Sequence, residues 1–134
     1  MLHCAAPDLR DAARVRSRDD ALAALTAAYG AVLREFAGAK LGGLRMLPIS
    51  GGVFAGEFAP ELPELTCAAL RGAFDALPAR ARHVVSVARL DMCIFDEKDE
   101  YAAYKEAFED ETRLAQEFAD SLQMGSTPTQ KWQT

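Results

Sequence analysis

The chain is poor in the residues that build metal centres and disulfides. It has three cysteines, Cys4, Cys67 and Cys93, and two histidines in 134 residues. The cysteines show no Cys-x-x-Cys spacing, and no histidine stands at the sequence spacing of a zinc ligand set. An odd, scattered set of thiols favours a reducing compartment and argues against zinc. We therefore expect an intracellular protein, cytoplasmic or nuclear, with no metal and no cofactor.

Positive charge and long apolar runs are also scarce. Lys and Arg number 15 against 20 acidic residues, which gives a net charge of −5. Binding to the nucleic-acid backbone depends on dense Lys and Arg, so DNA is not an expected partner. No run approaches the roughly 20 apolar residues that span a bilayer, and no signal peptide is visible. A membrane is therefore not an expected partner either.

Half of the residues are apolar, which is enough for one packed domain, expected over 1–123 with a disordered tail over 124–134. Hydrophobic periodicity predicts strands and helices in alternation. The predicted strands cover 1–6, 44–49 and 90–95, the last of them within the Val-rich stretch 84–95. The first predicted helix begins at Asp19 and is stopped by Gly38 and the Gly42-Gly43 pair. The other two run from Glu61 to Leu77 and from Asp96 to Leu122. Such an order predicts an α/β fold with a mostly parallel sheet. Residues 8–18 and 78–82 are read as polar surface connections.

The stretch 44–56 is the main candidate for a functional site. An apolar strand, expected to be buried on both faces, runs into the glycine-rich turn that contains Gly51, Gly52 and Gly56. A strand, a glycine loop and a helix together commonly present backbone N–H groups to an anion. The Walker signature is absent, because Glu57 and Phe58 stand where Lys and Ser or Thr are required. The dinucleotide fingerprint is absent too, and Ser50 lacks the surroundings of a hydrolase nucleophile.

The segment Pro48-Ile-Ser-Gly-Gly-Val-Phe-Ala-Gly56 resembles the second phosphate loop of macro domains. Met1 to Pro7 resembles a strand of that family, and Asp91 to Asp96, followed by Tyr101 and Tyr104, resembles its last strand and helix. The resemblance covers the carboxyl-terminal two thirds of the family pattern. It implies a three-layer α/β/α fold without its amino-terminal strands, and binding of ADP-ribose or ADP-ribosylated protein.

The first ligand loop of the family, an Asn-Ala-Ala-Asn-like segment before a glycine run, has no counterpart here. The chain is therefore expected to be either part of a longer protein, such as an ADP-ribosylhydrolase, or a divergent remnant. Catalysis cannot be assigned to any residue. The alternative function is an interaction or structural half-domain that self-associates through an open sheet edge.

The resemblance implies that a diphosphate is held by the 50–56 segment, with the adenine or ribose side at the end of the last strand. The ligand-binding residues are then Ser50, Gly51, Gly52, Val53, Phe54, Ala55 and Gly56, with Phe95 and Asp96 on the adenine or ribose side. The plainer interpretation is a tight turn, an apolar plug at Phe54, a core Phe95 and a helix cap at Asp96. No Lys or Arg lies between Met46 and Glu64, so backbone N–H groups rather than a side-chain charge are expected to bind the diphosphate.

Overall fold

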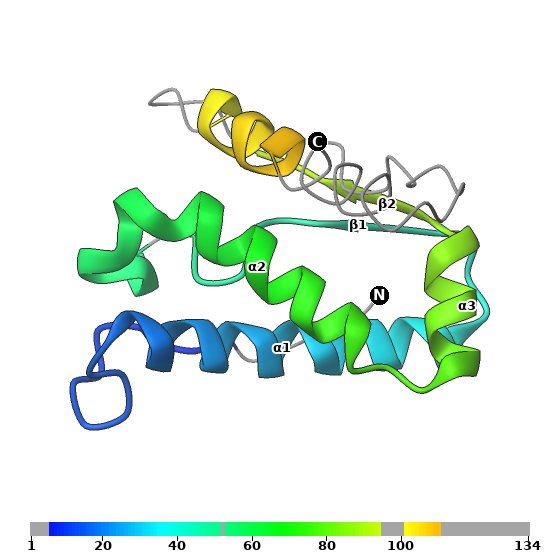
Figure 1. The fold of residues 1–134 in the computed structure, drawn as a ribbon, viewed down its shortest axis with the longest axis horizontal. Helices are drawn as coiled ribbons and strands as arrows, with labels where there is room; N and C mark the ends of the chain where they lie inside the picture. The colour runs from blue at the N-terminus through cyan, green and yellow to red at the C-terminus, as the bar shows by residue number, and fades with distance from the viewer. Residues whose placement is uncertain (1–5, 52, 95–100, 111–134) are drawn as a thin grey trace, which may run out of the picture.

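The computed structural model describes residues 6–51, 53–94 and 101–110, and shows a mixed α/β chain (Figure 1). Its elements in order are α1 (Arg18–Ala39), β1 (Gly43–Met46), the 3-10 helical segment η1 (Val53–Glu61), α2 (Leu62–Asp75), α3 (Ala79–Val87) and β2 (Arg89–Met92). Residues 101–110 are also helical. The two strands pair in parallel, as the sequence predicts, with Gly43 opposite Arg89 and Met46 opposite Met92. The predicted strand over 1–6 falls almost wholly outside the described residues.

Helix α1 begins where the sequence provides a hydrogen-bond acceptor and negative charges for its first turn. The Ser17 side chain accepts a hydrogen bond from the Asp20 N–H at 3.2 Å, and Asp19 and Asp20 lie at the positive end of the helix dipole. Gly38 and the Gly42-Gly43 pair are predicted to end this helix, and it ends between them, at Ala39, where Lys40 adopts the left-handed conformation with φ of 58°.

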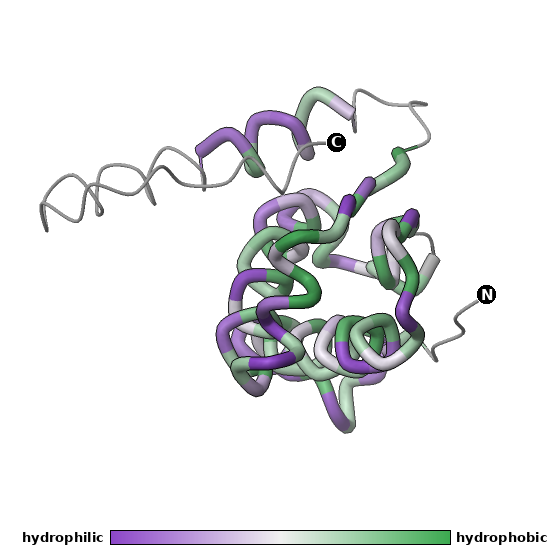
Figure 2. Tube along the Cα trace, turned by 90° about the vertical axis from the view of Figure 1, so that its right-hand side faces the viewer, coloured by the Kyte–Doolittle hydropathy of each residue, from purple (hydrophilic) through white to green (hydrophobic). Residues whose placement is uncertain are grey.

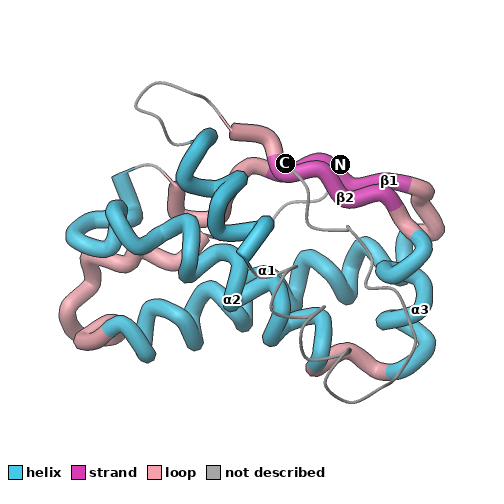
Figure 3. Tube along the Cα trace, turned by 45° about the horizontal axis from the view of Figure 1, so that its top comes forward, coloured by secondary structure: helices cyan, strands magenta, loops and turns pink. Residues whose placement is uncertain are grey.

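The core is centred on the contact between α1 and α2, which lie along each other in Figures 1 and 3. A Cβ placed on Gly72 would lie 3.4 Å from the Thr26 Cγ2 atom, so the backbones approach closely there. The large fully buried side chains that these two helices contribute are Leu25, Tyr29, Leu33, Phe36, Leu65 and Thr66. The predicted apolar faces of both helices are therefore the faces that pack.

Helix α3 was not predicted. The sequence predicts a polar link over 78–82 and places 84–87 in a Val-rich stretch that holds a strand. Pro78 instead precedes the first turn of a helix, and Val85 is fully buried on its inner side. Packing of Val85 thus outweighs the β-propensity of the valines, while Val87 is 72% exposed.

Strand β1 is shorter and more exposed than expected. It ends at Met46 rather than Ile49, and its residues alternate between exposed and half-buried, so the expectation of burial on both faces is wrong. Strand β2 likewise ends at Met92, and Phe95 lies outside the described residues. In Figure 1 the helix over 101–110 lies above the strands and α1 lies below them, and Figure 2 shows the chain from the side, coloured by hydropathy.

The helix over 101–110 confirms helical structure in that part of the expected third helix. Tyr104 and Phe108 of this helix are buried, whereas Tyr101 is 39% exposed. None of the helices in the described part of the chain is both long enough and apolar enough to cross a membrane.

Candidate functional site

The segment after β1 begins with a tight turn over Pro48–Gly51. The Gly51 N–H donates to the Pro48 carbonyl at 3.2 Å, and Ser50 adopts the left-handed conformation with φ of 61°. The positive φ therefore falls on serine, where the sequence analysis expected a glycine to supply it. Glycine is needed at position 51 for a different reason, because a Cβ there would lie 2.9 Å from the Pro48 carbonyl oxygen.

A hydrogen bond to α1 stabilises this turn. The Ile49 N–H donates to the hydroxyl of Tyr29 at 2.9 Å in a buried contact, and Tyr29 has no exposed surface. A buried backbone N–H without an acceptor is costly, so a tyrosine at this point of α1 satisfies the turn. Tyr29 was predicted only as part of the apolar face of its helix.

Residues 7–10 cover the turn from the amino-terminal side. The Ser50 hydroxyl donates to the Pro7 carbonyl at 2.5 Å, and the Leu9 N–H donates to the Phe54 carbonyl at 2.9 Å. Leu9 is 1% exposed and Val15 is 7% exposed, so the interpretation of 8–18 as a surface connection is wrong for these two side chains. Two isolated apolar residues in a charged stretch carry too little periodicity to reveal their burial from sequence.

The side chain of Arg10 lies on the second half of the segment. Its guanidinium carbon is 5.4 Å from the centre of the Phe54 ring, within the range of a cation–π contact. Gly56 has φ of 55°, and a Cβ at this residue would be 2.7 Å from the Arg10 Cγ atom. Glycine at 56 therefore serves both the backbone conformation and the approach of Arg10.

Asp8 orients this guanidinium. Arg10 Nε donates to Asp8 Oδ1 at 2.9 Å and Arg10 Nη2 donates to Asp8 Oδ2 at 2.9 Å, which is a two-bond contact. The backbone N–H of Arg10 also donates to Asp8 Oδ1, at 3.0 Å. The side-chain and backbone hydrogen bonds from Arg10 lower the pKa of Asp8 below its ordinary 3.8, and the side-chain hydrogen bond to Asp8 raises the pKa of Arg10.

The predicted ligand-binding residues differ in how exposed they are. Phe54 is 40% exposed at the surface of the segment, whereas Ser50 and Ala55 are buried and can offer a ligand little side-chain surface. Residues from 53 onward are not an open loop, because Val53–Glu61 forms η1, interrupted at Gly56. Gly52, Phe95 and Asp96 lie outside the described residues, and nothing is established for the side chain of Val53.

Arg10 is the site residue that the sequence analysis missed. The expectation of no side-chain charge at the segment considered only neighbours in the sequence, from Met46 to Glu64. The structure brings a cation from more than 40 positions away, as the Ser50 to Pro7 hydrogen bond between the two segments indicates. A Pro-Asp-x-Arg stretch directly after a predicted strand was the available signal.

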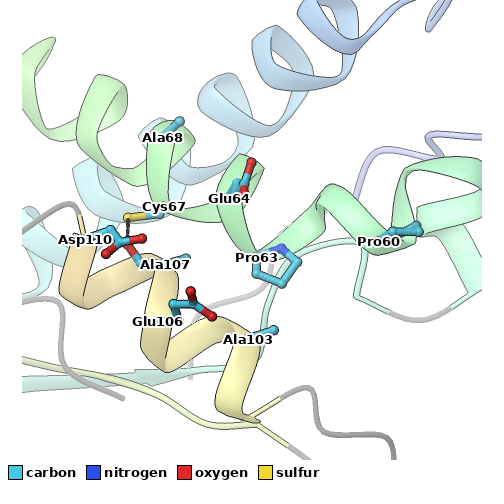
Figure 4. A pocket seen from close by; sticks show the side chains of 9 residues that line it. All are labelled: Pro60, Pro63, Glu64, Cys67, Ala68, Ala103, Glu106, Ala107 and Asp110. Atoms are coloured by element: carbon cyan, nitrogen blue, oxygen red, sulfur yellow. Dashed lines mark hydrogen bonds between the residues drawn. The ribbon is translucent and has the colours of Figure 1, made fainter.

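A concave region lies between α2, η1 and the helix over 101–110 (Figure 4). Its volume is about 330 Å³, and the carboxylates of Glu64, Glu106 and Asp110 line it. The thiol of Cys67 contacts the Ala107 carbonyl oxygen at 3.7 Å. Within the described ranges no group of three His, Cys, Asp or Glu side chains could hold a metal ion.

Comparison of the chain with protein-family models, with curated proteins and with solved structures finds no match.

Proposed function

We propose that the chain is a macro-domain-like module that binds ADP-ribose, or a related nucleotide diphosphate, through the 50–56 segment. The resemblance of Pro48–Gly56 to a phosphate loop suggests the ligand. The observation that carries the proposal is the position of the segment: it follows β1 at the edge of the sheet where both parallel strands end. The Cys93 N–H donates to the Met46 carbonyl at 2.8 Å, so the two carboxyl ends are adjacent there. Open α/β sheets bind ligands outside the carboxyl ends of their strands.

In this proposal the backbone N–H groups that open η1 face the diphosphate, and Phe54 packs against a ribose. Phe95 and Asp96, which follow β2, flank the adenine or its ribose. The complete arrangement would be three-layered, with helices on both faces of a parallel sheet. The two described strands and the helices on either side of them in Figure 1 are compatible with that arrangement.

The test is calorimetry with ADP-ribose on the wild type, Gly52→Glu and Gly42→Glu. A carboxylate at position 52 should abolish binding by repelling the diphosphate. Gly42 lies just before β1, at the opposite end of the strands, and a Cβ there meets no atom within 4 Å, so Gly42→Glu adds the same charge away from the segment. Equal loss in both variants, or no binding by the wild type, contradicts the proposal.

An interaction module is the second candidate, favoured by the edge of β1 that faces away from β2 and has no partner strand among the described residues. The Gly42 and Met46 carbonyls accept from β2, so the alternating Gly43 and Arg45 direct their backbone groups to the other side of β1. Neither residue has a further backbone hydrogen bond within the described ranges. A free edge invites pairing with another chain. Light scattering tests this function. A dimer that does not bind ADP-ribose would favour the interaction module over the ADP-ribose-binding module.

A further inference from the structure

We propose that Arg10 is the charged residue that binds the diphosphate at the 50–56 segment, through the edge of its guanidinium that Asp8 leaves open. This inference deepens the proposed function and rests on it for the position of the ligand. It replaces the expectation that backbone groups act alone. A guanidinium offers five N–H donors in a planar fork, which suits two oxygens of a phosphate.

The hydrogen bonds of Arg10 define which edge is open. Asp8 occupies Nε and one hydrogen of Nη2. The remaining hydrogens belong to Nη1 and Nη2, on the far edge of the fork, and Nη1 donates to no hydrogen bond among the described residues. The side chain is 48% exposed, so a solute can reach this edge. One planar group can therefore hold a carboxylate on one edge and a phosphate on another.

The guanidinium is also fixed in place before any ligand arrives. The Phe54 ring lies under it, Gly56 leaves space for its stem, and the Leu9 to Phe54 backbone hydrogen bond ties residue 9 to the segment. A cation that is already oriented loses less side-chain entropy when it binds. Arg14 provides a contrast, because it is 87% exposed and its ion pair with Asp11 is 3.9 Å long.

The experiment measures binding of inorganic pyrophosphate and of ADP-ribose to the wild type, Arg10→Ala, Arg10→Lys and Arg14→Ala. We expect Arg10→Ala to weaken pyrophosphate binding about 10-fold or more, because a charge-assisted two-bond contact is lost. Arg10→Lys keeps the charge without the planar fork, so its affinity for pyrophosphate should lie between those of the wild type and Arg10→Ala. Arg14→Ala should change the affinity less than about twofold, as expected of an exposed residue. Circular dichroism verifies that each variant folds. If Arg10→Ala does not fold, the affinity of Arg10→Lys is compared with that of the wild type instead.

The outcomes separate this inference from the proposed function. Pyrophosphate binding that depends on Arg10 without any ADP-ribose binding would support Arg10 and overturn the ADP-ribose assignment. ADP-ribose binding that is equal in the wild type and Arg10→Ala would overturn Arg10 and leave the assignment intact. Absence of pyrophosphate binding to the wild type, or equal loss in Arg14→Ala, also overturns the role of Arg10.

Discussion

Substitution of Tyr29 by phenylalanine tests how the candidate site is held. The change keeps the buried ring and removes only the hydroxyl that accepts from the Ile49 N–H at 2.9 Å. Ile49 is 8% exposed, so water cannot readily replace the lost acceptor. A buried donor without a partner costs about 1–3 kcal/mol of unfolding free energy. In a domain of this size that corresponds to a fall in Tm of about 3–5 °C for each kcal/mol.

The matched control is Tyr101→Phe, which removes the same hydroxyl from a side chain that is 39% exposed. A surface change of this kind should stay within about 0.5 kcal/mol of the wild type. Urea unfolding followed by circular dichroism gives both free energies, and amide hydrogen exchange at Ile49 reports the local effect. Equal stability of the two variants, with unchanged exchange at Ile49, would show that the hydroxyl does not support the turn.

Three further predictions concern stability and assembly. Gly56→Ala should lower the free energy of unfolding by about 1–3 kcal/mol, because φ at Gly56 is 55° and the added Cβ would meet Arg10. Gly38→Ala within α1 should raise it by about 0.5–1 kcal/mol in the same unfolding assay. Thr66→Val should raise stability by about 1 kcal/mol, because the buried Thr66 hydroxyl has no hydrogen-bond partner among the described residues; a lower Tm would contradict this. The purified chain should form a dimer or larger assembly through its sheet edge, and a monomer in light scattering would refute this. It should also release no ADP-ribose from a modified protein, and release in such an assay would refute the expectation of a non-catalytic chain.

The helical part of the fold was largely predictable because its signals are local. Leu25, Tyr29 and Leu33 recur at the helical period, and all three are buried on one face of α1. Pro63 in the first turn of α2 likewise marks the beginning of that helix. Helix α3 was missed because its four residues from Val84 to Val87 have the composition of a strand, and only the tertiary contact of Val85 decides otherwise.

The position of the turn was predictable from the sequence, but the contacts that support it were not. Glycines after an apolar strand indicated where the chain turns, and the turn lies at 48–51. The contacts that shape it come from Pro7, Leu9, Arg10 and Tyr29, each at least 20 positions from its partner. Local pattern carries no information about such pairs, so the cation at the segment and the buried hydroxyl beneath it could only be found from the structure.

The turn is held both by α1 and by the amino-terminal segment that carries the cation, which has a consequence for binding. Tyr29 fixes Ile49 from α1, whereas Pro7 and Leu9 fix Ser50 and Phe54 from the amino-terminal segment. Loss of the first anchor should disturb the backbone donors and leave Arg10 paired with Asp8. Loss of Arg10 should remove the charge and leave the turn intact. If both groups contact one diphosphate, each loss weakens binding alone, and their combined effect should be less than additive, because a displaced turn no longer holds the ligand where Arg10 can reach it.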